Sequence, residues 1–206
     1  LETMHHYSNT PGGELLGVVD DSGFELKHAS GWPTLSPDGR TLAVSERTPS
    51  ADRMALVMWD IDGTNPRRGY QDEVTVMGLE WSRNGRWLTF GAGSFFVSRT
   101  SQPAQIMIMK ADGSEVRTVT SGPGNAGFPS WSPDGREIVY RYWTENERGE
   151  GLRIVDVATG KSRVLTTEYD TLPFWSPKGD VIMFTRYAPD DRFPYDEFDI
   201  YTIRPD

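Results

Sequence analysis

The hexapeptide Trp131-Ser132-Pro133-Asp134-Gly135-Arg136 is the strongest fold signal in this 206-residue chain, because related hexapeptides recur along it at nearly even intervals. They stand at residues 35–40 (LSPDGR), 81–86 (WSRNGR) and 175–180 (WSPKGD), so that successive glycines are 46, 50 and 44 residues apart. In such a turn proline fixes φ at the first corner, aspartate bonds its own backbone, and glycine accepts a positive φ. Each copy therefore predicts a tight turn between two strands, here named the Ser-x-x-Gly hairpin.

A second unit recurs in phase with these hairpins. It is an apolar run that ends in a glycine turn, present at four places, and a fifth copy reaches the end of the given sequence where its glycine would fall. Two motifs that repeat together every 40–50 residues are the signature of a repeat architecture. The runs are residues 56–59, 106–109 and 152–157, with further copies at 15–19 and 200–203.

Each repeat unit predicts four strands. In the copy around Gly135 they are expected at 128–131, 137–142, 152–157 and 162–166, where β-branched and aromatic residues run between Pro, Asp, Asn and Gly. No stretch keeps a 3.6-residue apolar period, so no long helix is expected. Such units indicate an all-β fold, a β-propeller of four-stranded antiparallel blades.

The strand count predicts a little over four blades. Because an open array leaves apolar blade faces uncovered, the chain is expected to be part of a larger ring or to complete its ring with another chain. The expected divisions are an N-terminal extension at 1–14, a partial blade at 15–28, blades at 31–70, 75–120 and 126–166, and a partial blade at 171–206.

Composition excludes several classes of protein. The chain has no cysteine, which excludes a disulfide scaffold, cysteine-ligated zinc and thiol catalysis. Its 21 basic and 30 acidic residues give a net charge of −9, which argues against nucleic-acid binding, since that binding needs clustered positive charge. No apolar run approaches the roughly 18 residues of a membrane span, so no membrane insertion is expected.

The hexapeptide, the Asp-Gly turn at 111–113 and the Arg-x-x-Thr pattern at 117–120 resemble the TolB-type propeller repeat, a WD40-like family. The resemblance covers almost everything after residue 14. Leu35, Arg83-Asn84 and Lys178 depart from the family pattern as turn and core variations. The resemblance implies a periplasmic or extracellular location. Similar repeats accompany serine peptidases of the prolyl oligopeptidase type and polysaccharide-degrading enzymes, so the repeat alone leaves the function open.

Loop length indicates which face of the propeller binds. The connections between the second and third strands of each unit are long and varied, at 46–53, 91–104, 143–151 and 188–198, whereas the other turns are short. Variable loops on a rigid scaffold usually carry function, and aromatic residues with arginine are typical of interface hot spots. The alternative is that the aromatic rings pack onto blade edges. The candidate binding residues are Arg47, Phe95, Phe96, Arg99, Tyr142, Trp143, Arg148, Arg186, Tyr187, Arg192 and Phe193.

Catalytic and metal motifs are scarce in the sequence. There is no Gly-x-Ser-x-Gly elbow, and His28 is interpreted as a loop or satisfied core histidine, with a general base as the alternative. The acidic residues between 190 and 199 suit a calcium site or an acid/base pair, and the simpler interpretation is a solvated acidic loop. No catalytic residue, metal or cofactor is therefore assigned. The sequence favours a non-enzymatic scaffold for a protein or peptide partner, and the alternative is a propeller that accompanies an enzyme.

Overall fold

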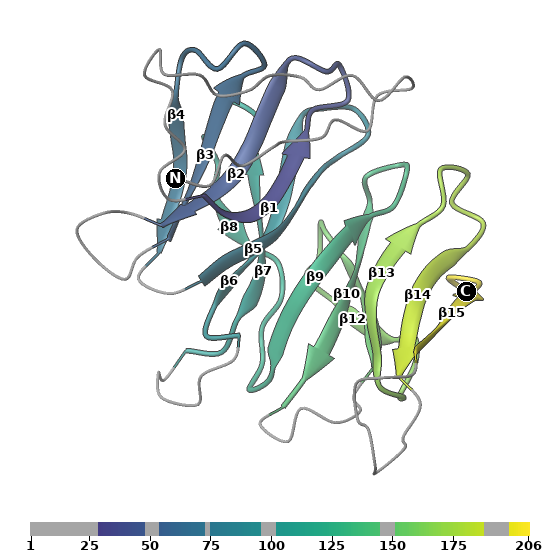
Figure 1. Ribbon diagram of the computed structural model, residues 1–206. Helices are drawn as coiled ribbons and strands as arrows, with labels where there is room; N and C mark the ends of the chain where they lie inside the picture. Colours follow the sequence, from purple (N-terminus) through teal and green to yellow (C-terminus); the bar gives the residue numbers. More distant parts are fainter. Residues whose placement is uncertain (1–28, 48–53, 73–74, 96–101, 145–150, 188–197) are drawn as a thin grey trace.

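The computed structural model describes residues 29–47, 54–72, 75–95, 102–144, 151–187 and 198–206. These residues form fifteen strands and no helix, in four separate antiparallel sheets that follow one another along the chain (Figure 1). The all-β prediction, with four-stranded antiparallel blades, is confirmed. The partial blade expected at 15–28 lies outside the described residues.

Every sheet is a simple meander in which sequence neighbours pair. The first sheet holds β1 (Ala29–Leu35), β2 (Thr41–Arg47), β3 (Met54–Asp60) and β4 (Arg67–Asp72). The second holds β5 (Thr75–Trp81), β6 (Trp87–Gly93), β7 (Gln105–Lys110) and β8 (Arg117–Thr118). The third holds β9 (Asn125–Trp131), β10 (Glu137–Trp143), β11 (Leu152–Asp156) and β12 (Ser162–Val164), and the last holds β13 (Asp170–Trp175), β14 (Ile182–Tyr187) and β15 (Phe198–Ile203).

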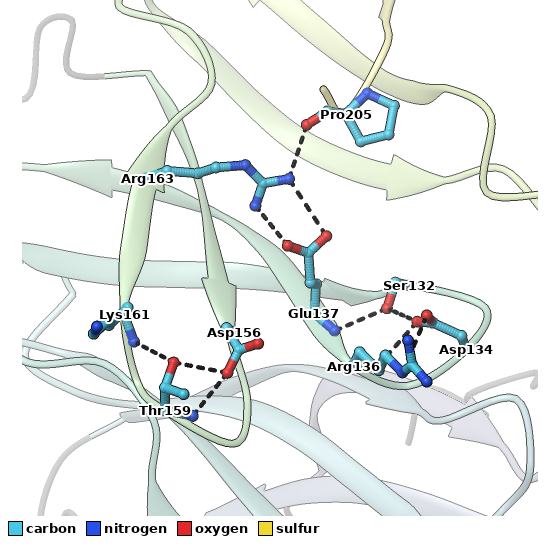
Figure 2. A network of polar contacts seen from close by, with 9 residues as sticks. All are labelled: Ser132, Asp134, Arg136, Glu137, Asp156, Thr159, Lys161, Arg163 and Pro205. Atoms are coloured by element: carbon cyan, nitrogen blue, oxygen red, sulfur yellow. Dashed lines mark hydrogen bonds and ion pairs between the residues drawn. The ribbon is translucent and has the colours of Figure 1, made fainter.

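A serine hydroxyl organises each Ser-x-x-Gly hairpin. In the third sheet Ser132 Oγ donates to Asp134 at 2.7 Å and accepts the amide of Glu137 at 2.9 Å, while Asp134 also accepts the amide of Arg136 (Figure 2). Gly135 follows with a φ of +71°, which other residues adopt at a cost. The hydroxyl bond to Asp134 holds the pKa of that carboxyl below its usual value. The hairpin is thus fixed by its own side chains.

The sheets stack through their apolar faces, and three buried clusters mark the three junctions. Trp81 and Leu88 belong to the cluster between the first and second sheets, and Trp131 and Ile138 to the one between the second and third. Trp175 packs against the cluster that joins the third sheet to the last. The repeated tryptophans therefore serve inter-blade packing, the interpretation that their fixed position favours.

An arginine links each of two successive junctions by the same contact. Arg117, in β8, donates to the carbonyl of Val157 in the next sheet at 3.0 Å. Arg163, in β12, donates to the carbonyl of Pro205 at 2.8 Å and pairs with Glu137 (Figure 2). The Arg-x-x-Thr pattern also fixes the ends of its own sheet, because Thr120 accepts the amide of Ile106 at 2.9 Å. These residues explain the pattern as structural.

Each innermost strand carries a bulge at the same position. The residues Trp32, Gly78, Phe128 and Leu172 all have φ between +50° and +67°, and the register of each strand with its neighbour shifts there. A bulge re-aims the side chain of the residue that it contains. Three of these four residues are not glycine, so three large side chains are held in a conformation that L-residues rarely adopt.

The outer faces of the first and last sheets differ. On the first sheet Val44, Ala55 and Val57 are almost fully buried. On the last sheet Phe174, Met183 and Ile200 are 52, 44 and 68 % exposed, although Val139, at the position equivalent to Met183 in the third sheet, is completely buried. The apolar face of the last sheet is therefore exposed, as expected for the end of a stack of repeats that has no further sheet beside it in the described part of the chain.

The hairpin hydroxyl gives a stability prediction. Ser132→Ala leaves the amide of Glu137 and the carboxylate of Asp134 without their shared partner, which should lower the free energy of unfolding by about 1 kcal/mol. Urea denaturation measures the change. Lys161→Ala alters an exposed side chain beside a short turn of the same sheet. It should change the free energy of unfolding by less than about 0.5 kcal/mol. Equal effects of the two variants would contradict the hairpin's role.

Candidate functional site

Because every sheet is a meander, the turns that join its strands lie alternately on two opposite faces of the molecule. The Ser-x-x-Gly hairpins and the short glycine turns lie together on one, here named the hairpin face. The opposite one, named the long-loop face, holds the connections between second and third strands. Phe95, Tyr142, Trp143, Arg186 and Tyr187 are described there. The backbone of Arg47 ends β2, and its side chain is outside the described part, as are Phe96, Arg99, Arg148, Arg192 and Phe193.

Two of the predicted binding residues, Phe95 and Trp143, form one buried aromatic cluster. Their ring centroids are 5.9 Å apart, and each side chain is only 2 % exposed. Gly91 and Gly127 make room for the ring of Phe95, since a Cβ on either would stand within 2.5 Å of it. Tyr142 is also buried, with the guanidinium of Arg153 over its ring at 3.5 Å. These three aromatic side chains are therefore part of the packing beneath the long-loop face.

The bulged residues extend this cluster between sheets. Phe128 lies 6.2 Å from Trp143 and 6.5 Å from Phe95, and it meets Trp32 of the first sheet at 5.7 Å. The contact of Trp32 with Phe128 passes over the second sheet, where the equivalent residue is Gly78. Trp32 is 42 % exposed, so its ring presents an apolar surface to solvent.

The ring contacts continue through an arginine into the last sheet. The guanidinium of Arg141 lies 4.7 Å from the ring of Trp143 and 4.8 Å from that of Tyr169, a cation–π arrangement with two partners. Tyr169 lies 4.9 Å from Tyr187, which in turn lies 6.2 Å from Phe198. The contacts form one series, named the aromatic row: Trp32, Phe128, Trp143, Arg141, Tyr169, Tyr187 and Phe198.

Arg186 is tied to the sheet that carries it. Its guanidinium donates two hydrogen bonds to Asp170, at 2.7 and 2.8 Å, and the ring of Tyr201 lies 5.0 Å away. The side chain of Asp170 is fully buried, whereas that of Arg186 is 32 % exposed. The bond to Asp170 raises the pKa of Arg186 above its usual value. Arg186 therefore positions the start of β13 and offers only part of its surface to a partner.

Sequence reasoning found part of this row. It selected Trp143 and Tyr187 but missed Trp32, Phe128, Arg141, Tyr169 and Phe198. A signal was present, because the bulged residues of three inner strands all precede a proline, at Pro33, Pro129 and Pro173. Each proline stands two residues before the first residue of a hairpin hexapeptide.

The site offers recognition chemistry. Among the described residues no three His, Cys, Asp or Glu side chains lie together in a way that holds a metal ion. Of the acidic residues between 190 and 199, only Asp199 is described, and His28 is not. No helix in the described part of the chain is long and apolar enough to cross a membrane. Aromatic rings, an arginine and a few exposed apolar atoms suit a polypeptide partner.

Comparison with known proteins gives a family match over most of the chain. The model of the TolB beta propeller domain matches residues 24–193. The uncharacterized protein Atu1656 of Agrobacterium fabrum is 28 % identical over 169 residues, 77 % of this chain and 55 % of its own length. The uncharacterized peptidase YuxL of Bacillus subtilis is 26 % identical over 132 residues, 64 % of this chain and 17 % of its own length. The chain thus spans about half, or much less, of these relatives.

Solved structures agree on the fold. TolB from Acinetobacter baumannii aligns with a TM-score of 0.68 at 16 % identity, over 93 % of this chain and 43 % of that one. Oligogalacturonate lyase from Vibrio parahaemolyticus aligns with a TM-score of 0.59 at 12 % identity, over 80 % of this chain and 47 % of that one. At these identities the likeness concerns the fold alone.

The buried ion pair gives a prediction for this face. Asp170→Asn removes the charge that Arg186 faces, and the free energy of unfolding should fall by about 1–3 kcal/mol, less than for a fully buried pair because water reaches Arg186. The matched control is Asp60→Asn, since Asp60 pairs with Arg67 at 2.8 Å on the surface. That change should cost less than about 1 kcal/mol. Thermal denaturation of both variants checks the difference, and a smaller loss for Asp170→Asn would contradict the assignment.

Proposed function

The chain belongs to the TolB beta-propeller family, and we propose that it is a non-enzymatic scaffold that binds a protein or peptide partner on its long-loop face. The observation that carries the proposal is the aromatic row, which spans the first, third and last sheets with contacts of 4.7–6.2 Å. Binding to such a surface costs little conformational entropy, because the rings are already held in place before the partner arrives. Aromatic residues and arginine supply most of the energy at protein interfaces.

Exposure decides which residues of the row would touch the partner. Trp32 and Phe198 are 42 and 60 % exposed, and Tyr187 is half-buried. Phe95 and Trp143 would act as supports, since their rings are enclosed. The binding residues Arg47, Phe96, Arg99, Arg148, Arg192 and Phe193, which the sequence predicts, would extend the contact from the loops. The exposed face of the last sheet would take a further blade, from a longer chain or from a second copy.

Family membership also supports a location outside the cytoplasm, periplasmic or extracellular. The net charge of −9 favours a polypeptide over a nucleic acid as the partner. Shape and aromatic anchoring would provide affinity, and arginine–carboxylate pairs at the rim would add specificity.

A second candidate function is a propeller that accompanies an enzyme. It is favoured by the relative named as a peptidase, and the fold likeness to oligogalacturonate lyase is consistent with it. The long-loop face would then receive a substrate or a catalytic domain. A Gly-x-Ser-x-Gly segment in the full-length gene would support the peptidase version of this function.

Binding measurements with exposed residues test the proposed function. Trp32→Ala and Tyr187→Ala should each raise the Kd for the purified physiological partner at least tenfold in isothermal titration calorimetry, because each removes an anchor ring. Arg192→Ala tests the loop contribution by the same measurement.

The matched control lies on the hairpin face. Arg136→Ala, at a side chain that is 84 % exposed, should change the Kd less than twofold. Unchanged affinity in both Trp32→Ala and Tyr187→Ala, or an equal loss in Arg136→Ala, would overturn the choice of face. Circular dichroism of every variant shows whether the loss comes from binding or from unfolding.

A further inference from the structure

A carboxylic acid is buried between the inner strands of the second and third sheets. Glu80 lies in β5, one residue before Trp81, and its side chain reaches β9. Ser130 donates its hydroxyl to Glu80 Oε1 at 3.2 Å, and the amide of Trp131 donates to the same oxygen at 3.4 Å. Glu80 Oε2 is fully enclosed and has no hydrogen-bond partner among the described residues. An ionised carboxylate in such a place lacks the donors that would stabilise its charge.

The hydrogen bonds of Glu80 continue to the last sheet. Ser130 Oγ also accepts the amide of Trp175 at 3.2 Å. In both junctions the amide of a hairpin tryptophan therefore donates to a side chain of the preceding sheet. That side chain belongs to the residue just before the tryptophan of the preceding hairpin, which is Glu80 in one junction and Ser130 in the other. At one junction that side chain is a neutral hydroxyl, and at the other it is a titratable acid. Glu80 is thus the one group in this series whose charge can change.

Among the residues that the structure describes, no charged group near Glu80 would hold it ionised. Opposite Glu80 on β6 stands Thr89, and the contacts from β9 are those of Ser130 and Trp131. Burial is the main cause that raises its pKa to about 7, and the two hydrogen bonds lower it by less. No charged side chain of the described strands, including Arg67 and Arg68 on β4 and Asp170 on β13, contributes to that pKa.

We propose that Glu80 forms a pH-sensitive joint between the second and third blades: β5 and β9 pack closely there while its carboxyl is neutral, and their contact loosens when the carboxyl ionises. The two strands touch closely beside it, since a Cβ on Gly78 would stand 3.1 Å from Pro129 and 3.3 Å from the Cα of Phe128. Ionisation draws water toward Oε2 and separates β5 from β9 at this contact. The bulge that carries Phe128 lies in the same stretch of β9, so the joint acts next to the aromatic row.

The direction of the pH effect follows from the two states. In the unfolded chain Glu80 titrates near 4.5, and in the folded chain near 7. Its contribution to stability is therefore complete below about pH 4.5 and is lost as the pH rises through about 7. The hairpin aspartates act in a separate window, because hydrogen bonds lower the pKa of Asp38 and Asp134 and their contribution is lost only below about pH 4.

The experiment compares the pH dependence of the unfolding equilibrium in three proteins. Between pH 4.5 and 8 the wild-type equilibrium constant for unfolding should rise on the order of a hundredfold more than that of Glu80→Gln, which keeps the shape without the charge. Glu115→Gln, at a carboxylate that is 59 % exposed, should follow the wild type. Parallel profiles of wild type and Glu80→Gln would overturn the proposal.

A direct titration keeps the test decisive if Glu80→Gln folds poorly. The carboxyl ¹³C resonance of Glu80 should titrate with a midpoint near 7 in the wild type. Ser130→Ala removes a bond that favours the ionised form, so the midpoint should move to higher pH. A purely structural role of Ser130 would not move it. A wild-type midpoint near 4.5 would overturn the proposal.

Discussion

The structure depends on the burial of sheet faces against one another. A four-stranded sheet with two apolar faces cannot hide both by itself, so each sheet is stable only beside a neighbour. The three buried clusters between successive sheets meet this requirement, and each includes, or packs against, the tryptophan that opens a hairpin hexapeptide. The hairpin keeps that tryptophan at the end of the innermost strand. Arg117 and Arg163 bridge two of the three junctions, those that flank the third sheet, from the outer strands. Local turn chemistry and inter-sheet packing therefore support the same arrangement.

In the proposed function, the bulge in each inner strand turns this packing into a recognition surface. The residue at the bulge differs from sheet to sheet: it is a tryptophan, a glycine, a phenylalanine and a leucine, so that a large side chain is re-aimed in three of the four sheets. The glycine in the second sheet lets rings of the first and third sheets meet. Positive φ at Trp32 and Phe128 is costly for such residues, and its recurrence at one position argues that the packing of the whole array maintains it.

The sequence predicted the strands well where turn chemistry delimits them. The main difference is at β9, which begins at Asn125 and not at 128, because the bulge at Phe128 interrupts the regular alternation without ending the strand. The site was harder to predict. The burial of Phe95 depends on Gly91 and on Gly127, a residue of another sheet, and the contact between Trp32 and Phe128 depends on Gly78. Nothing local distinguishes Glu80 from an exposed strand glutamate. Such contacts form only when distant segments meet, so a reading of one segment at a time does not find them.

Successive sheets are arranged so that the bulges of the first and third meet across the second. The most direct test is a nuclear Overhauser measurement between the ring protons of Trp32 and Phe128 in selectively labelled protein. Ring centroids 5.7 Å apart predict clear cross-peaks between the two side chains. Their absence, in a sample whose Phe95–Trp143 cross-peaks are present, would contradict this arrangement of the sheets.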